Sequence, residues 1–361
     1  NCTPYQKTFY AQTHYTIRHT RNHHLGRDYA ASRGEYLNGK IVAKLLGFTF
    51  IDAADVIFFD ESGKYDGRRT IPVLRERLSY TEYAVIPGFY GSMPNDTIRT
   101  FSRGGSDITG SIVAAAADAD LYENWTDVSG FLFADPHVVD NPQVMKTVTY
   151  RELRELSYMG ATVIHEDAIF PVMQKKIPIR IKNTNAPDDT GTLILADTDE
   201  PAANTVTGIA GRKGFSSINI EKYRIHDECG AVRRMLEVLE EHGVNFEHIP
   251  SGIDNFSIVV ETTSLADETD DIVYDIKKVT SASSVTVENG IALIAVVGRS
   301  MKSTRGVAGT IFSSLAKENI NIKMIDQGSS EINIVIIWQT RCFGTPVRAH
   351  PSAPRYRKAE S

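Results

Sequence analysis

The sequence is poor in cysteine, since its 361 residues include only Cys2, Cys229 and Cys342. Three scattered cysteines are too few for a disulfide framework, and their spacing matches no zinc motif. Long apolar runs are also missing: none approaches the roughly 20 residues of a membrane-spanning helix. The polar start lacks the apolar segment of a secretory signal. We therefore expect reduced thiols, no membrane partner, no metal-binding cluster and a cytoplasmic location.

Positive charge is not in excess, because 39 Lys and Arg residues are set against 45 Asp and Glu residues, a net charge of −6. Such a balance argues against the basic surface that binds nucleic acid or anionic membranes, so neither partner is expected. With 42% hydrophobic and 23% charged residues, the composition is that of a globular protein. The length indicates about two or three domains.

Apolar strand-like runs alternate with helical patterns between residues 34 and 195. This alternation favours a three-layer α/β domain. A polar stretch with prolines and acids, residues 186–205, then marks a domain boundary. The predicted helices are Lys40–Leu46, Ile71–Leu78 and Ile108–Ala119, and the predicted strands are Val56–Phe59 and Tyr83–Pro87.

An internal repeat follows this boundary. Val244-Asn245-Phe246 recurs as Ile320-Asn321-Ile322, a constant offset of 320 − 244 = 76 residues that also relates Gly230 to Gly306 and Leu239 to Leu315. One register over a loop, a helix and two strands predicts two copies of a βαβ-type module.

The stretch between residues 100 and 136 carries the strongest functional signal. Arg103-Gly104-Gly105-Ser106-Asp107 opens an alanine-rich helix, and Thr126-Asp127-Val128-Ser129-Gly130 and Ala134-Asp135-Pro136 follow. Paired glycines let backbone amides approach a ligand, and the unpaired amides of a helix start favour a carboxylate or phosphate. These motifs predict a two-part site for an anion and a nucleotide.

Together these motifs resemble those of the aspartate kinases, of the amino-acid kinase superfamily. The repeats resemble the paired ACT domains of the same family, which are ferredoxin-like βαββαβ modules. We judge the resemblance to cover roughly residues 26–336. Further matching segments are Ser32-Arg33-Gly34-Glu35, Gly88-Phe89-Tyr90-Gly91, Thr149-Tyr150-Arg151-Glu152, His165-Glu166-Asp167, Ile218-Asn219-Ile220, His248-Ile249-Pro250 and Met324-Ile325-Asp326-Gln327-Gly328.

The resemblance implies phosphoryl transfer from ATP to the β-carboxylate of L-aspartate, giving 4-phospho-L-aspartate with Mg²⁺ as cofactor. The resemblance implies that Arg103 binds the substrate α-carboxylate through two parallel hydrogen bonds and that Glu35 faces the substrate ammonium. Arg103 and Asp107 are the predicted catalytic residues, and Gly104, Gly105 and Ser106 complete the aspartate site. Ser106 and Asp107 could instead serve only as helix caps.

The implied nucleotide site contains Thr126, Asp127, Val128, Gly130, Asp135, Pro136 and His137. His137 departs from the family, which usually has arginine after Asp-Pro, and a mostly neutral histidine would weaken the phosphate contact. Lys182 could face the nucleotide, although an exposed lysine is the simpler interpretation.

A second departure concerns the start of the chain. Aspartate kinases open with a strand and a glycine-rich Lys-Phe-Gly-Gly-Ser-type loop that holds the transferring phosphate, whereas here Gly104-Gly105 is the only Gly-Gly pair. Residues 1–24 show no resemblance that we could identify. The proline-containing basic end after residue 337 is expected to be disordered. Both ends would be consistent with a frameshift or a gene fragment.

The ACT resemblance also implies feedback regulation. The predicted effector is lysine, in some relatives with threonine, bound by His226, Asp227, Gly230, Ala231, Val232 and Asn255. Pairing of ACT modules predicts a homodimer or a larger assembly, although these modules could also form a purely structural interface.

The predicted organisation therefore has five parts: an atypical segment 1–25, a partial amino-acid kinase domain 26–196, a linker 197–205, tandem ACT modules 206–337 and a tail 338–361. The predicted function is that of an aspartate kinase acting at the first step of lysine, threonine and methionine biosynthesis. The alternative is a catalytically silent, amino-acid-binding regulatory chain or a truncated fragment, because the phosphate loop is missing.

Overall fold

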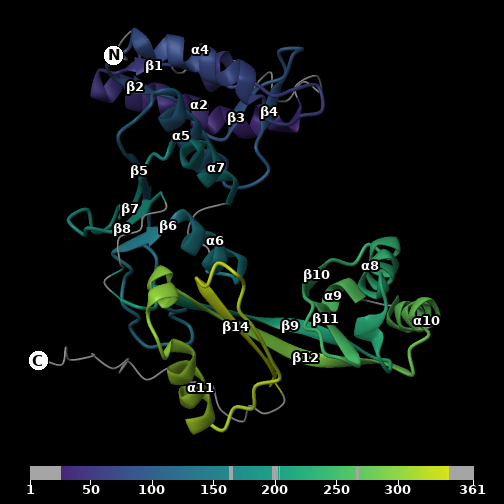
Figure 1. The fold of residues 1–361 in the computed structure, drawn as a ribbon. Coiled ribbons are helices and arrows are strands. Elements are labelled where there is room, and N and C mark those ends of the chain that lie inside the picture. The colour runs from purple at the N-terminus through teal and green to yellow at the C-terminus, as the bar shows by residue number, and fades with distance from the viewer. Residues whose placement is uncertain (1–25, 162–165, 197–201, 203, 266–267, 341–361) are drawn as a thin grey trace, which may run out of the picture. The chain divides into compact units, whose positions relative to one another are not determined.

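The computed structural model describes residues 26–161, 166–196, 202, 204–265 and 268–340 (Figure 1). The described residues form two compact units: residues 26–130 with residues 166–196, and residues 131–161 with the described residues from 202 to 340. The predicted segment 1–25 lies outside the described residues, as do most of the predicted linker 197–205 and of the tail 338–361.

Three helices of the first unit correspond to the predicted ones. The second of them begins at Gly67, four residues before the predicted start at Ile71, because the Asp66 carboxylate caps it by accepting hydrogen bonds from the amides of Arg68 and Arg69. The first helix begins 13 residues earlier than predicted. Only Ser32, Gly39 and Ala43 of that helix are buried, so it shows little apolar periodicity. The helices are α2 (Arg27–Leu46), α3 (Ala53–Val56), α4 (Gly67–Ser79), α5 (Gly105–Ala116) and α7 (Glu166–Lys175).

The predicted strand Val56–Phe59 is wrong. Val56 ends the short helix α3, and Phe58 and Phe59 form only isolated bridges, to Ser92 and Tyr65. The cause is a capping interaction: the Asp52 carboxylate accepts a hydrogen bond from the Ala54 amide at 3.0 Å and starts a helical turn. The apolar residues alone indicated an extended run.

The strands of the first unit are short. The predicted strand Tyr83–Pro87 is reduced to two residues, which pair in parallel with β1. Strand β5 pairs in parallel with β7, which pairs antiparallel with β8, and β3 pairs antiparallel with β4. The strands are β1 (Thr49–Phe50), β2 (Ala84–Val85), β3 (Tyr90–Ser92), β4 (Ile98–Thr100), β5 (Tyr122–Thr126), β7 (Ile179–Asn183) and β8 (Thr192–Leu195).

The second unit is built on two long antiparallel strands, β9 (Gly208–Glu221) and β12 (Ser284–Val297), which pair along most of their length. They lie at the centre of a sheet with the order β10-β11-β9-β12-β14-β13. The outer strands are β10 (Phe246–His248), β11 (Asn255–Glu261), β13 (Met324–Asp326) and β14 (Asn333–Gln339).

The predicted repeat appears in the helices of this unit. Helix α8 (Ala231–Glu241) and helix α11 (Val307–Lys317) match at both ends when shifted by the repeat offset. Each starts after a glycine with a positive φ, 79° at Gly230 and 84° at Gly306, a backbone conformation that favours glycine. The remaining helices are α9 (Thr262–Leu265), α10 (Thr269–Thr280), η1 (Ile225–Asp227) and η3 (Arg299–Ser303).

The two modules are interleaved rather than consecutive. Residues 215–221 of β9 pair with β11, whereas residues 208–213 pair with residues 292–297 of β12, which also pair with β14. Strand β9 passes from one module to the other at Gly214, whose φ is 94°. Opposite this glycine, the pairing with β12 shifts in register between Asn289 and Ile291. One strand therefore contributes to both modules.

Each module has its own core. Met235, Ile258 and Ile276 are buried in the first, and Val296, Ile334 and Ile336 in the second. Residues 131–161 belong to the same compact unit and contain β6 (Thr147–Thr149) and α6 (Tyr150–Tyr158).

Candidate functional site

The N-terminus of α5 has the features expected of an anion site. Gly104 precedes the helix with a φ of 60°, and no side chain caps the first-turn amides. Arg103 is exposed beside them. Amides at a helix start favour an anion, and the adjacent guanidinium adds a full positive charge. The local arrangement therefore suits a carboxylate or a phosphate.

Close packing explains why the second glycine of this motif is needed. A Cβ atom added at Gly105 would lie 2.5 Å from the Cβ of Phe89 and 3.0 Å from the Cβ of Phe101. Phe89 itself has a φ of 61°, and its amide donates a hydrogen bond to the Thr109 hydroxyl at 3.0 Å. The start of α5 is thus held against the loop of residues 88–89.

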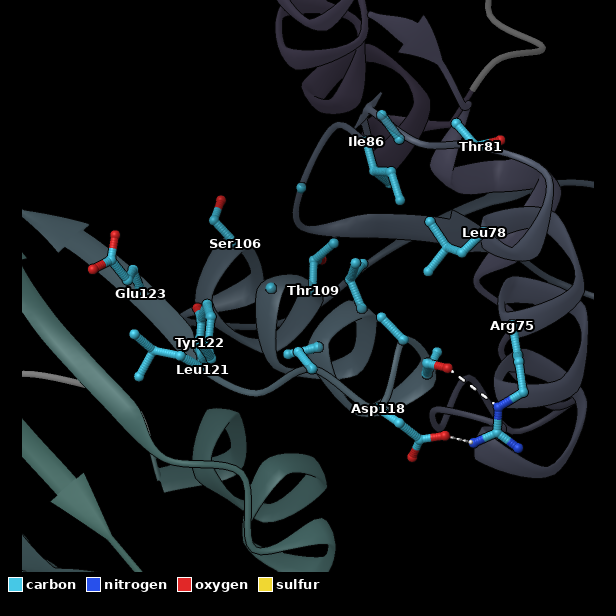
Figure 2. A pocket seen from close by; sticks show the side chains of 18 of the residues that line it. Arg75, Leu78, Thr81, Ile86, Ser106, Thr109, Asp118, Leu121, Tyr122 and Glu123 are labelled. Atoms are coloured by element: carbon cyan, nitrogen blue, oxygen red, sulfur yellow. Dashed lines mark hydrogen bonds and ion pairs between the residues drawn. The ribbon is translucent and has the colours of Figure 1, made fainter.

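A cavity of about 810 Å³ lies beside α5 within the first unit. Glu35 of α2 and Ser106 of α5, both predicted aspartate-site residues, line it together with Gly88. Figure 2 shows Ser106 and Tyr122 on the side of α5 and β5, with Leu78 of α4 opposite. The structure therefore brings the predicted counter-charge for the substrate ammonium and the start of α5 to the same cavity.

Asp107 is held by two residues that sequence reasoning missed. The Asn124 amide donates a hydrogen bond to Asp107 Oδ1 at 2.8 Å, and the Tyr122 hydroxyl donates one to the Asp107 carbonyl at 3.2 Å. Burial raises the pKa of Tyr122 to about 12, so its hydroxyl stays protonated at neutral pH. An asparagine two residues before the Thr126 motif was the available sequence signal, and only the structure shows that Asn124 is buried.

The predicted loop 126–130 follows the end of β5. The Thr126 hydroxyl donates a hydrogen bond to Asp127 at 3.2 Å, and Asp127 and Val128 are exposed. Gly130 has a φ of 120°, and an added Cβ would lie 2.3 Å from the Thr192 hydroxyl oxygen. Packing against β8 thus requires glycine there, independently of any ligand.

Lys182 does not extend away from the protein. Its ammonium donates hydrogen bonds to the carbonyl oxygens of Pro187 and Asp189 at 2.7 and 2.6 Å and lies 5.3 Å from the centroid of the Trp125 ring. These contacts fix the loop after β7, which gives Lys182 a structural role.

Asp135, Pro136 and His137 lie in the second unit, whereas Thr126, Asp127, Val128 and Gly130 lie in the first. The three residues of the Asp135–His137 turn are exposed, and the Asp135 carboxylate accepts a hydrogen bond from the His137 amide at 2.8 Å. The Asp135 carbonyl accepts bonds from Val138 and Val139. The motif thus forms a tight turn with an exposed imidazole.

The predicted effector residues lie around the start of α8. His226 and Asp227 form η1, Ala231 is buried, and Val232 packs on the core of the first module. The His226 amide donates a hydrogen bond to the Ile253 carbonyl at 3.3 Å, which connects this loop to the turn before Asn255.

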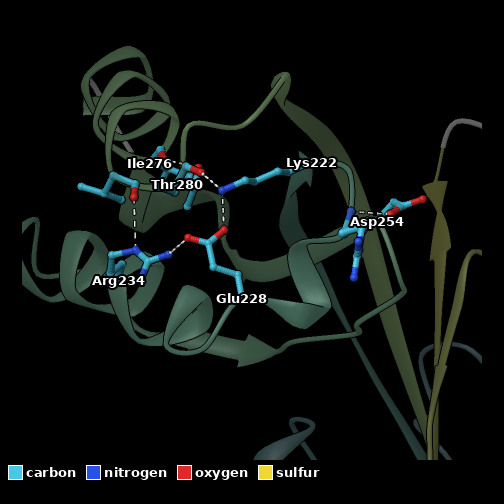
Figure 3. A network of polar contacts seen from close by, with 8 residues as sticks. Lys222, Glu228, Arg234, Asp254, Ile276 and Thr280 are labelled. Carbon is cyan, nitrogen blue, oxygen red and sulfur yellow. Dashed lines mark hydrogen bonds and ion pairs between the residues drawn. The ribbon is translucent and has the colours of Figure 1, made fainter.

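A charged network that the sequence did not reveal holds the same loop. Figure 3 shows Glu228 between Lys222 and Arg234, and both cations form ion pairs with it. These pairs lower the pKa of Glu228, the Lys222 hydrogen bond most strongly. Lys222 also donates to the Thr280 carbonyl at 2.7 Å and Arg234 to the Val279 carbonyl at 3.2 Å. The network ties the loop to the end of α10.

Two negative findings apply to the described part of the chain. None of its helices is long and apolar enough to cross a membrane. Nor does it contain a group of three or more His, Cys, Asp or Glu side chains placed to hold a metal ion.

Comparisons with known proteins define the class. The amino acid kinase family profile matches residues 6–183, and an ACT domain profile matches residues 294–342. The first match includes most of the N-terminal segment in which we had found no resemblance. The chain is thus a regulated amino-acid kinase.

Individual relatives narrow this class. Aspartokinase 3 of Bacillus subtilis is 38% identical over 320 residues, covering 85% of this chain and 70% of the relative. The crystal structure of Clostridium acetobutylicum aspartate kinase has a TM-score of 0.85 and 53% identity, over 92% of this chain and 77% of that one. The chain belongs to the aspartate kinase family with C-terminal ACT domains.

A more distant structure shares the fold. Escherichia coli aspartokinase III in complex with aspartate and ADP has a TM-score of 0.65 at 24% identity, covering 87% of this chain and 72% of that one.

Proposed function

We propose that this aspartate kinase transfers the γ-phosphoryl group of ATP to the β-carboxylate of L-aspartate. The observation that carries the proposal is the arrangement at α5: Ser106 of its first turn and Glu35 of α2 line one cavity, and Arg103 stands two residues before the first helical residue. An α-amino acid has a carboxylate for Arg103 and an ammonium for Glu35. The family membership supplies the reaction class.

The chemistry makes small demands on proton transfer. The β-carboxylate of aspartate has an ordinary pKa near 3.9, so it is already a nucleophile at neutral pH. One of its oxygens forms the new bond to the γ-phosphorus, the bond to the bridging oxygen breaks, and ADP leaves with that electron pair. Positioning and positive charge therefore dominate catalysis. Asp107, oriented by Asn124, is the proposed second catalytic residue.

The nucleotide is proposed to contact Thr126, Asp127, Val128 and Gly130, and also Asp135, Pro136 and His137. Mg²⁺ is the proposed cofactor, and it would neutralise charge on the triphosphate. Magnesium is usually held by substrate phosphates with only one or two carboxylates. The proposal therefore needs no dedicated three-ligand cluster on the protein.

Lysine, with threonine as a second candidate, is the proposed effector at the loop formed by His226, Asp227, Gly230, Ala231, Val232 and Asn255. Another E. coli aspartokinase III structure contains lysine and aspartate, and this chain is similar to it in fold. The proposed product, 4-phospho-L-aspartate, would feed lysine, threonine and methionine biosynthesis through diaminopimelate and related intermediates in the cytoplasm. Pairing through the ACT modules would give a homodimer or larger assembly.

Aspartate-dependent ADP release by the purified chain with Mg-ATP tests this proposal, run with and without lysine at matched ionic strength. We expect turnover that lysine suppresses. A folded chain that binds lysine without any turnover would instead support the alternative of a silent regulatory chain.

A further inference from the structure

Glu152 of α6 is a charged residue with no solvent exposure. One oxygen, Oε2, accepts hydrogen bonds from the Thr149 amide at 2.9 Å and from Arg299 Nη1 at 2.8 Å. The other, Oε1, accepts from the Thr207 hydroxyl and the Arg299 amide, both at 2.7 Å. Burial works to raise the pKa of Glu152, but Thr207, the two amides and the Arg299 charge together lower it. The carboxylate is therefore ionised and fully bonded.

These partners connect α6 to the second ACT module. Arg299 belongs to η3, directly after β12, and Thr207 directly precedes β9. One helical turn further along α6, Glu155 accepts a hydrogen bond from Asn333 at the start of β14, at 2.6 Å. Three separate segments of the second module thus contact one face of α6.

The segment that contains the Asp135 turn also packs on the second ACT module. Residues 131–145 fold back on themselves: the Phe133 amide donates to the Gln143 carbonyl and the Met145 amide to the Phe131 carbonyl, both at 2.8 Å. The Ile209 amide of β9 donates to the Phe133 carbonyl, also at 2.8 Å. A Cβ added at Gly208 would lie 2.5 Å from Met145 Cε, so the segment packs tightly on β9.

We propose that Glu152 is a positioning residue that fixes residues 131–161, and with them Asp135 and His137, to the second ACT module. The regulatory modules then set ATP affinity through this segment. The proposal rests on the function proposed above for the Asp135 turn and extends it to regulation. Moving the segment away from the module would separate Glu152 from Arg299 and leave a buried charge unpaired, which is energetically costly. The ion pair therefore favours the arrangement in which the segment stays attached.

Glu152→Gln tests the attachment directly, because it keeps the shape of the side chain and removes its charge. We expect faster hydrogen exchange of the Phe133 and Met145 amides, with unchanged exchange in α5. The matched control is Glu237→Gln on α8, an exposed glutamate whose partner is Arg233. Unchanged exchange at Met145 in Glu152→Gln would overturn the proposal, as would an equal increase in the control.

Regulation is tested by calorimetric binding of ATP with and without lysine. In Glu152→Gln we expect the lysine-dependent change in ATP affinity to shrink by about 2- to 30-fold, with the affinity for aspartate unchanged. The Arg299→Gln variant and the double variant should show the same loss as Glu152→Gln, because the pair acts as one unit. An intact lysine response in all three would contradict the regulatory role.

Two further experiments test the proposal if the first variant does not fold or if the ligands do not bind. If Glu152→Gln fails to fold, Thr207→Val removes a single hydroxyl and should still accelerate exchange at Met145; unchanged exchange there would overturn the proposal. If the unmodified chain binds neither ATP nor lysine, the proposed function fails, while the exchange experiment still decides whether Glu152 attaches the segment.

Discussion

Two side chains near the start of α5 differ in their hydrogen bonding and solvent exposure. Asp107 accepts a hydrogen bond from Asn124, whereas Arg103 is exposed at the start of the helix. A flexible, exposed guanidinium can form two parallel hydrogen bonds with an incoming carboxylate. The charge recognition of the proposed aspartate site therefore depends most on Arg103.

Replacing Arg103 with alanine should weaken aspartate binding by roughly 10- to 100-fold, because hydrogen bonds to charged groups contribute about 1.5–3 kcal/mol. Titration calorimetry with aspartate measures this loss. Assembly of the chain, followed by sedimentation velocity, should not change. Unaltered aspartate affinity would remove Arg103 from the site.

His137→Arg should have the opposite effect on the nucleotide. The imidazole is exposed next to Asp135, and an arginine there carries a permanent positive charge toward phosphate oxygens. Because solvent screens an exposed pair, we expect the KM for ATP to fall by no more than about 5-fold. Steady-state kinetics at fixed aspartate provide the measurement, with His137→Gln as the uncharged control. A KM that does not differ between the two variants would show that position 137 does not contact the phosphates.

At the scale of elements, α8 and α10 are joined by a histidine. His242, the residue that ends α8, contacts Glu268 at 2.7 Å and Asp275 at 3.3 Å. Hydrogen bonds to Glu268 and then Asp275 raise the pKa of His242, because both carboxylates favour the protonated ring. The ion pairs therefore join α8 and α10 only while the ring is charged.

This contact should make stability depend on pH. The pKa is raised in the folded state, so its contribution is fully present below the ordinary histidine pKa of about 6.5 and is lost as pH rises through the folded value. The contribution should be below about 1 kcal/mol, since the groups are near the surface. Urea unfolding from pH 5.5 to 9 should show this decline in the unmodified protein, and His242→Gln should abolish it. A variant that keeps the full decline would assign the pH dependence to other groups.

At the scale of the whole molecule, the two compact units differ in which proposed ligand they hold. The predicted aspartate residues all lie in the first unit, and the predicted effector residues all lie in the second. A ligand that binds only the folded form of one unit stabilises that unit, by about 2.7 kcal/mol at 100 times its dissociation constant.

Calorimetric unfolding should therefore show two transitions that respond separately. Aspartate should raise the temperature of one and lysine the temperature of the other, because each ligand binds a different cooperative unit. Scans with alanine at the same concentration control for non-specific effects. A single transition that both ligands shift equally would contradict the separate assignment.

Local features of the fold could be predicted from the amino-acid sequence. Helices α4 and α5 overlap the predicted ones but begin four and three residues earlier, and the repeat offset recurs at both ends of α8 and α11. These predictions succeeded because caps, glycines and apolar periodicity act over only a few residues. The family was also readable, since its motifs are contiguous stretches of sequence.

Contacts between residues far apart in the chain became visible only in the folded structure. It showed that β9 serves both modules and that residues 131–161, which lie within the match to the amino acid kinase family, pack in the same compact unit as the ACT modules. It also supplied partners such as Arg299 for Glu152, which are 147 residues apart in the chain. No local pattern encodes such a pairing, because the burial that makes it favourable exists only after the chain has folded.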